Sequence, residues 1–141
     1  MFNQILVAVD LSTEKVTKKL CQTANDMAEK YQGEITLMTV IPDYGMPIVA
    51  SFFPEDAQKK LRLEVQEKLQ ALAKIHFKVP TSIQLKQGKP RKVILKTIEE
   101  QKPDLVMIGC RLKNSENAQA FLGATGTAVS DRASCSVMIV R

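Results

Sequence analysis

Asp10 is the first residue of this 141-residue sequence whose type and position suggest a binding role. It directly follows the apolar run Ile5–Val9, and a carboxylate there could accept hydrogen bonds from a sugar hydroxyl or a base amine. The same carboxylate could instead cap the helix that is expected to follow, because aspartate is a preferred N-cap residue. The sequence leaves both roles open.

Two glycine-containing segments in the second half of the chain could bring the backbone close to a ligand. Gly109, Cys110 and Arg111 follow the apolar run 105–108, and a glycine there allows a tight turn and a close approach. The segment Gly123–Gly126 is expected to open or lie in the last helix, where unpaired amides and the helix dipole attract anions. Ordinary loop glycines would explain the same spacing.

The apolar runs before these segments predict the elements that position them. Ile5–Val9 and 105–108 are continuous apolar runs, which indicates strands buried on both faces of a parallel sheet. Between the strands, apolar residues at steps of three and four predict helices. The expected strands are 5–9, 35–41, 82–87, 105–108 and 136–140. Of the four expected helices, the first ends before Gly33 and the second begins near Pro54. The third runs from Pro90 to Pro103, and the fourth spans 121–133.

The strict alternation of strands and helices predicts one α/β domain over residues 1–141. Its fold is expected to be a doubly wound five-stranded parallel sheet in the order 3-2-1-4-5, with helices on both faces. Ligands of such sheets bind outside the carboxyl ends of the strands, where the strand order reverses. The reversal lies between strands 1 and 4, so the loops 10–12 and 109–123 are expected to form the site.

Residue types also predict several local features. Gly33 is expected to cap the end of the first helix, and Ser12 or Thr13 its start. Cys110 is expected in an exposed loop beside Arg111, as either a reactive thiol or a spectator. Along the second helix one apolar stripe is expected to face the sheet, formed by Ala57, Leu61, Val65, Leu69, Leu72 and Ile75.

Composition argues against several classes of protein. The net charge is +5, and the basic excess lies in residues 59–102, where basic residues stand between apolar positions at helical spacing. A solvated helix face explains these residues, and Phe77 alone does not supply the stacking platforms that single-stranded nucleic acid needs. Three cysteines and one histidine, His76, show no metal-ligand spacing and support neither a zinc site nor a catalytic triad.

Targeting and catalytic motifs are missing from the sequence. Its longest apolar runs are too short to cross a bilayer, and its first residues lack the basic region and cleavage site of a signal peptide. It has no G-x4-G-K-[ST] phosphate loop. We therefore expect a cytoplasmic protein that is not an enzyme and binds no metal through its own cysteines or histidine.

Taken together, the sequence resembles the universal stress protein family in four segments: 5–10, the Gly-Lys-Pro turn at 88–90, 104–111, and 135–141. The resemblance covers the whole chain and implies a Rossmann-like fold of the adenine nucleotide alpha hydrolase type. It implies that ATP or another adenine nucleotide, with or without Mg²⁺, binds in the cleft at the ends of strands 1 and 4. Asp10 would lie near the adenosine, and the main chain near Val40 would meet the adenine. The phosphate loop would involve Gly109, Arg111, Gly123 and Thr125.

The loop of the nucleotide-binding members has the form G-x2-G-x9-G-[ST], and this sequence departs from it. Leu112 stands in place of the second glycine, and ten residues instead of nine separate it from Gly123. Ala124 replaces the serine or threonine, with Thr125 one place later. A lost hydroxyl removes a hydrogen bond to a charged group, worth about 1.5–3 kcal/mol. The side chain of Arg111 and its neighbours could compensate.

The last strand, 136–140, is expected at an edge of the sheet. It is apolar on both faces and contains no proline, glycine or charge that would prevent pairing. Two copies are expected to pair there antiparallel as a homodimer, which the resemblance also implies. The alternative to a nucleotide-binding stress protein is a dimeric protein-interaction module of the same fold that binds no nucleotide.

Overall fold

The computed structural model of the chain describes residues 1–42, 55–110 and 123–141. The expected strands and helices are present, and the predicted helix starts at 54 and 121 lie outside the described residues. In chain order the elements are β1 (Gln4–Ala8), α1 (Glu14–Tyr31), β2 (Glu34–Ile41), α3 (Glu55–His76), β3 (Thr81–Gln87), α4 (Pro90–Gln101), β4 (Leu105–Gly109), α5 (Gly123–Arg132) and β5 (Ser136–Val140).

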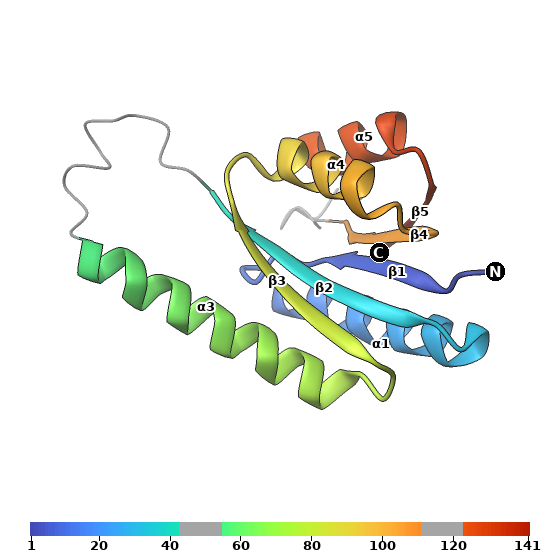
Figure 1. Ribbon diagram of the computed structural model, residues 1–141, viewed down its shortest axis with the longest axis horizontal. Helices are drawn as coiled ribbons and strands as arrows, with labels where there is room; N and C mark the ends of the chain where they lie inside the picture. The colour runs from blue at the N-terminus through green and yellow to red at the C-terminus, as the bar shows by residue number, and fades with distance from the viewer. Residues whose placement is uncertain (43–54, 111–122) are drawn as a thin grey trace, which may run out of the picture.

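The strands form a parallel sheet in the order β3-β2-β1-β4-β5, which confirms the predicted fold. β1 lies at the centre, and its Val7 is in register with Leu37 of β2 and with Met107 of β4. Figure 1 shows α1 and α3 on one face of the sheet and α4 and α5 on the other. The strand order reverses between β1 and β4, so the carboxyl ends of these two strands flank the switch point.

Each face of the sheet has its own apolar core, because successive residues of a strand point to opposite faces. Val7 belongs to a cluster with Leu20 of α1, while Leu6 belongs to a second cluster with Ile98 of α4. All four side chains are at most 1% exposed. Burying one aliphatic side chain completely is worth about 1.5–3 kcal/mol, so β1 must be apolar on both faces.

The end of α1 differs from the prediction. Gln32, and not Gly33, is the residue in the left-handed conformation, with φ of 53°. Gly33 is needed for a different reason: a Cβ at this position would lie 2.5 Å from the carbonyl oxygen of Phe2. The chain at Gly33 therefore passes too close to the start of β1 to carry a side chain.

The apolar stripe of α3 also differs from the prediction at one residue. Leu69 is fully buried, but Ile75 is 74% exposed. Ile75 follows Leu69 by six positions. At about 100° per residue this places the two side chains about 240° apart around the helix axis, so they point in different directions. Ala73 and Phe77 pack against the core in its place. Figure 1 shows the first turns of α3 extending past the ends of the strands.

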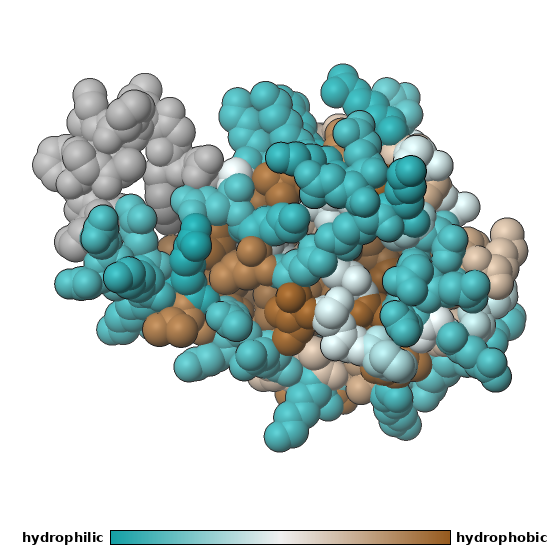
Figure 2. Space-filling model, viewed as in Figure 1, coloured by the Kyte–Doolittle hydropathy of each residue, from teal (hydrophilic) through white to brown (hydrophobic). Residues whose placement is uncertain are grey.

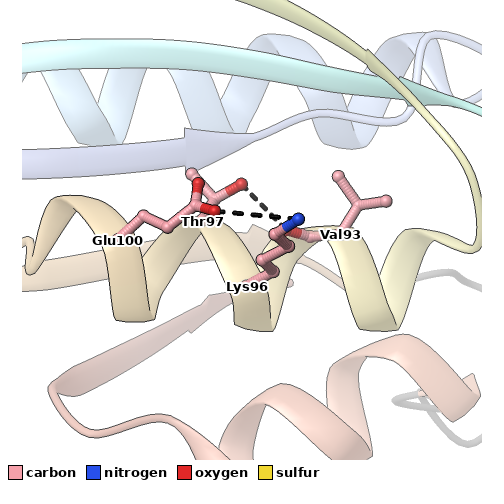
Figure 3. A network of polar contacts seen from close by, with 4 residues as sticks. All are labelled: Val93, Lys96, Thr97 and Glu100. Atoms are coloured by element: carbon pink, nitrogen blue, oxygen red, sulfur yellow. Dashed lines mark hydrogen bonds and ion pairs between the residues drawn. The ribbon is translucent and has the colours of Figure 1, made fainter.

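Helix α4 shows how the polar residues of a packed helix are accommodated. Its one buried hydroxyl, that of Thr97, donates to the carbonyl of Val93 at 2.8 Å, as Figure 3 shows. On the solvent side, the Lys96 ammonium and the Glu100 carboxylate lie 3.8 Å apart. An exposed pair of this kind contributes about 0.3–0.5 kcal/mol. Pro103 lies just beyond the end of α4, as the sequence predicts.

The basic residues of 59–102 lie on the surface. All of them are exposed except Lys86, which is half-buried, and this confirms the prediction of a solvated face. Figure 2 shows hydrophilic side chains over most of the face that carries α3, β3 and α4, with hydrophobic ones visible between them. Within the described ranges, no helix is long and apolar enough to cross a membrane.

Candidate functional site

Asp10 lies in the loop between β1 and α1, and its side chain organises that loop. Its Oδ1 accepts hydrogen bonds from the Ser12 amide at 3.0 Å and from Ser12 Oγ at 2.6 Å. The N-cap residue of α1 is Thr13, which makes no side-chain capping bond. The alternative that Asp10 caps α1 is therefore wrong, and so is the expectation of a hydroxyl cap from Ser12 or Thr13.

Two buried threonines hold the main chain at the end of β1. Thr17 of α1 donates its hydroxyl to the Asp10 carbonyl at 2.8 Å, and Thr39 of β2 donates to the Val9 carbonyl at 2.8 Å. Both threonines are at most 6% exposed. Sequence reasoning missed them, although a threonine inside an otherwise apolar buried pattern is a signal for such a bond. They fix the backbone from which the Asp10 carboxylate projects.

A cavity of about 800 Å³ lies at the carboxyl ends of β1, β2 and β4, next to the starts of α1, α4 and α5. Its walls include five of the six candidate residues, namely Asp10, Val40, Gly109, Gly123 and Thr125. The sixth candidate, Arg111, lies outside the described residues, as do Leu112 and the rest of the loop to 122. The tertiary structure thus brings together residues that are up to 115 positions apart in the sequence.

Much of the cavity wall is apolar, and part of it comes from helices that the sequence reasoning did not include. Leu61 and Val65 contribute from α3, and Pro90 and Ile94 from α4. Leu61 and Val65 lie in the part of α3 before its single fully buried residue, Leu69. Such walls suit a flat hydrophobic group such as a nucleobase, held in place by a few polar groups.

Glycine is favoured at the two candidate positions for different structural reasons. A Cβ at Gly109 would lie 2.5 Å from Cγ1 of Val16, so glycine is needed there for α1 to pack against β4. Gly123 has φ of 71°, in the region that favours glycine, and a Cβ there would meet no atom within 4 Å. Gly123 starts α5 beside the cavity, whereas packing alone explains Gly109.

The cysteines and the histidine offer little to a reaction in the cavity. Cys110 is 1% exposed, so the expectation that it lies in an exposed loop is wrong; its amide donates to the Val140 carbonyl at 2.9 Å and so extends the ladder between β4 and β5. Burial raises the pKa of the Cys21 thiol to about 11. His76 is the last residue of α3 and is not among the described wall residues. No group of three potential metal ligands occurs within 1–42, 55–110 and 123–141.

Comparison with known proteins identifies the family. The whole chain, residues 1–141, matches the sequence model of the universal stress protein family. The chain belongs to this family. A curated relative from Thermus aquaticus, the universal stress protein in the QAH/OAS sulfhydrylase 3' region, is 33% identical over 146 residues, and the alignment covers 100% of both chains.

Solved structures of universal stress proteins share the fold. UspA from Lactobacillus plantarum superimposes with a TM-score of 0.75 at 24% identity, covering 99% of this chain and 98% of that one. The universal stress protein from Archaeoglobus fulgidus in complex with dAMP gives a TM-score of 0.71 at 15% identity, with coverage of 99% and 98%. At these identities the similarity shows the fold of this universal stress protein.

Proposed function

We propose that this universal stress protein binds an adenine nucleotide in the cavity at the carboxyl ends of β1 and β4. The observation that carries the proposal is the position of the candidate residues: those from β2, the β1–α1 loop, β4 and α5 that the structure describes all border that one cavity. An open parallel sheet binds ligands at such a switch point. The dAMP complex of a relative with the same fold supports the choice of ligand.

Each part of the nucleotide would meet a different part of the wall. The adenine would lie against the apolar side chains of Leu61, Val65 and Ile94, with its edge near the main chain of Val40. The Asp10 carboxylate would accept from a ribose hydroxyl. A phosphate would lie at the start of α5, where Thr125 and the first amides of the helix border the cavity.

A Mg²⁺ ion, if it accompanies the nucleotide, would find few protein ligands here. Of the wall residues that the structure describes, only Asp10 carries a carboxylate. Mg²⁺ commonly binds through one or two carboxylates together with substrate phosphates and water, and the carboxylate of Asp10 is the one assigned above to the ribose, so the ion would be held mainly by phosphate oxygens and water. The ion would then neutralise phosphate charge.

Calorimetry with adenine nucleotides tests the proposed function. We expect binding in the micromolar range or weaker, and Asp10→Ala should weaken it by about tenfold or more, because a hydrogen bond to a charged group is lost. Asp26→Ala is the matched control, since Asp26 is exposed on α1 and is not a wall residue. No heat with any adenine nucleotide, at protein concentrations near millimolar, would defeat the proposal.

The same proposal makes the protein a nucleotide-responsive factor of the cytoplasmic stress response and not an enzyme. Family membership supports the role in stress, and three cysteines without disulfide or metal spacing suit a reducing compartment. The described cavity wall offers no histidine as a general base. ATP hydrolysis faster than about one turnover per second, lost in Asp10→Ala, would contradict this part of the proposal.

We also propose a homodimer through β5, which lies at an edge of the sheet. Its apolar residues Val137, Met138 and Ile139 are half-buried in one copy. The Val140 carbonyl accepts from the amide of Cys110, directly after β4. Because the polar groups of successive residues in a strand point to opposite sides, those of Ile139 point outward. Light scattering should report a dimer, and Ile139→Pro should give a folded monomer. A monomeric unmodified protein would contradict this proposal.

The second candidate function is a dimeric interaction module without a nucleotide. The replacement of the second loop glycine by Leu112 and of the hydroxyl residue by Ala124 favours it. This candidate predicts the same dimer but no calorimetric response to adenine nucleotides. The binding experiment therefore separates the two candidates directly.

A further inference from the structure

The strand β3 lies at the edge of the sheet opposite β5 (Figure 1). Directly before β3, the Pro80 carbonyl accepts from the Ile35 amide at 2.9 Å. Directly after it, the Gly88 amide donates to the Ile41 carbonyl at 3.0 Å. The even-numbered residues of this segment therefore direct their backbone groups toward β2, and the odd-numbered residues of β3 direct theirs outward. Within 1–42, 55–110 and 123–141, no backbone group pairs with this outward row.

The two faces of β3 differ in chemistry. Ile83 packs against the apolar cluster on the side of α1 and α3, whereas the Gln84 side chain accepts a hydrogen bond from Gln101 of α4 at 2.7 Å. Because successive side chains of a strand point to opposite faces, Leu85 shares the face of Ile83. Lys86 shares the face of Gln84 for the same reason. A strand added at this edge would therefore meet apolar side chains toward α3 and a cation toward α4.

The surroundings of the β3 edge are strongly basic. The 31 residues 68–98 contain eight Lys or Arg and no Asp or Glu. Lys86 lies in β3, and Lys89 is the N-cap residue of α4, two positions after the strand ends. From α3, Arg62 Nη2 donates to Oε1 of Gln87, the last residue of β3, at 2.6 Å and adds a further positive charge. Like charges oppose the pairing of two copies of β3, whereas an acidic strand is attracted.

We infer that the β3 edge is a docking surface for an acidic, extended segment of another protein, which joins the sheet as an additional strand. In strand addition, main-chain hydrogen bonds supply affinity and the side chains on the two faces supply specificity. The faces of β3 select a segment that alternates apolar and acidic residues, with the acidic ones beside Lys86. No residue of β3 is among the described wall residues of the cavity, so this inference does not depend on nucleotide binding.

The outward row favours a peptide over a nucleic acid. Donors and acceptors alternate along it, as they do along any extended peptide backbone, whereas phosphate groups offer acceptors alone. Single-stranded nucleic acid also needs exposed rings for base stacking. The one aromatic residue of 68–98, Phe77, instead packs against the apolar core.

Amide hydrogen exchange in the presence of a synthetic octapeptide of alternating Val and Glu tests the inference. We expect the peptide to slow exchange about tenfold at the outward amides, and this protection to decrease at high salt. The outward amides are those of Thr81, Ile83, Leu85 and Gln87. An octapeptide of alternating Val and Lys should have no effect. No slowing by the Val-Glu peptide, or equal slowing by a single-stranded oligonucleotide, overturns the inference. So does slowing that follows protein concentration without any peptide, because the occupant is then a second copy.

A modified peptide and a pair of variants test the two physical causes. The Val-Glu peptide with its amides N-methylated keeps its charge but has no donor for the ladder, so equal binding of the two peptides overturns strand addition. Lys86→Glu with Lys89→Glu should weaken binding about tenfold. Lys18→Glu with Lys19→Glu makes the same change of charge at exposed positions of α1 and should leave binding unchanged. Equal binding by both double variants overturns the role of charge. If the Lys86 variant does not fold, the salt dependence and the Val-Lys peptide decide that role.

Discussion

Two aspartates lie at opposite ends of the sheet and act over very different distances along the chain. Asp104, just before β4, accepts hydrogen bonds through Oδ2 from the amides of Asn3 and Gln4 at 3.0 and 2.9 Å. Asp10, just after β1, accepts from Ser12, two residues away. The first carboxylate joins two strands that are about 100 residues apart, whereas the second shapes a local turn beside a cavity. The comparison indicates that the amino ends of the strands maintain the fold and the carboxyl ends provide the site.

The glycines of the two ends differ in the same way. At the amino end, a Cβ on Gly33 would lie 2.5 Å from a backbone oxygen, which cannot move without displacing β1. At the carboxyl end, a Cβ on Gly109 would meet a side chain at the same distance, and one on Gly123 would meet nothing. Substitutions should therefore reduce stability most at the amino end.

The largest effect is expected for Gly33→Ala. The new methyl group would displace the start of β1 from α1, and we expect a loss of about 3 kcal/mol or more, which is at the upper end for single substitutions. Urea unfolding measures it. Gly123→Ala is the control, with open space but an unfavourable φ, and should lose only about 1–2 kcal/mol. Equal losses of stability at positions 33 and 123 would contradict the proposed contrast between the amino and carboxyl ends of the strands.

Gly109→Ala is expected to cost somewhat less, about 2 kcal/mol, because its new methyl group meets the side chain of Val16, which can adjust. Removing that side chain with Val16→Ala should relieve the clash. In a double-mutant cycle the two substitutions should therefore be less harmful together than the sum of their separate effects. If the double variant also binds nucleotide normally, Gly109 serves packing and not the ligand. Strict additivity would show that the contact with Val16 is irrelevant.

Substitution of the two aspartates should separate stability from binding. Asp104→Ala loses two hydrogen bonds to main-chain amides, but both are exposed and water can replace the carboxylate, so we expect a loss of only about 1.5 kcal/mol with unchanged nucleotide affinity. Asp10→Ala should do the reverse, with a smaller loss of stability and about tenfold weaker binding. Chemical unfolding measures the stability of each of the two variants, and calorimetry measures its nucleotide affinity. Weaker binding in the Asp104 variant would remove the distinction.

The smallest effect is expected from the buried hydroxyl of Thr17. Thr17→Val keeps the shape but leaves the Asp10 carbonyl with one donor fewer, at a cost of about 1 kcal/mol. Thr17→Ser keeps the hydroxyl, so the nucleotide affinity of this variant should be closer to that of the unmodified protein than the affinity of Thr17→Val is. A serine variant that binds no better than the valine variant would mean that Thr17 does not position Asp10.

Much of the fold could be predicted from sequence, because its main signals are local. A continuous apolar run such as Ile5–Val9 can be buried on both faces, and such strands alternating with helices build a parallel sheet covered on both sides. The strand order then places loops 10–12 and 109–123 at the switch point. Asp10, Val40, Gly109, Gly123 and Thr125 accordingly border one cavity, although their roles in binding stay predictions.

The features that sequence reasoning got wrong depend on atoms that are distant in the chain. Gln32 takes the left-handed conformation and Gly33 instead passes beside the Phe2 carbonyl, a contact between two segments that no helix-end rule contains. Cys110 looked exposed because polar residues follow it, yet it is buried and continues the ladder with β5. Ile75 continued a plausible stripe, but α3 turns it toward solvent.

The sequence by itself determined the class of fold, the strand order and the end of the sheet where a ligand would bind, because hydrophobic periodicity and glycine placement reflect backbone geometry residue by residue. Only the tertiary structure decided that Thr17 and Thr39 hold the carbonyls at the end of β1, and that Val16 is the reason for Gly109. These are contacts between elements. Their existence depends on how closely helices and strands pack, and a pattern along one chain does not contain that distance.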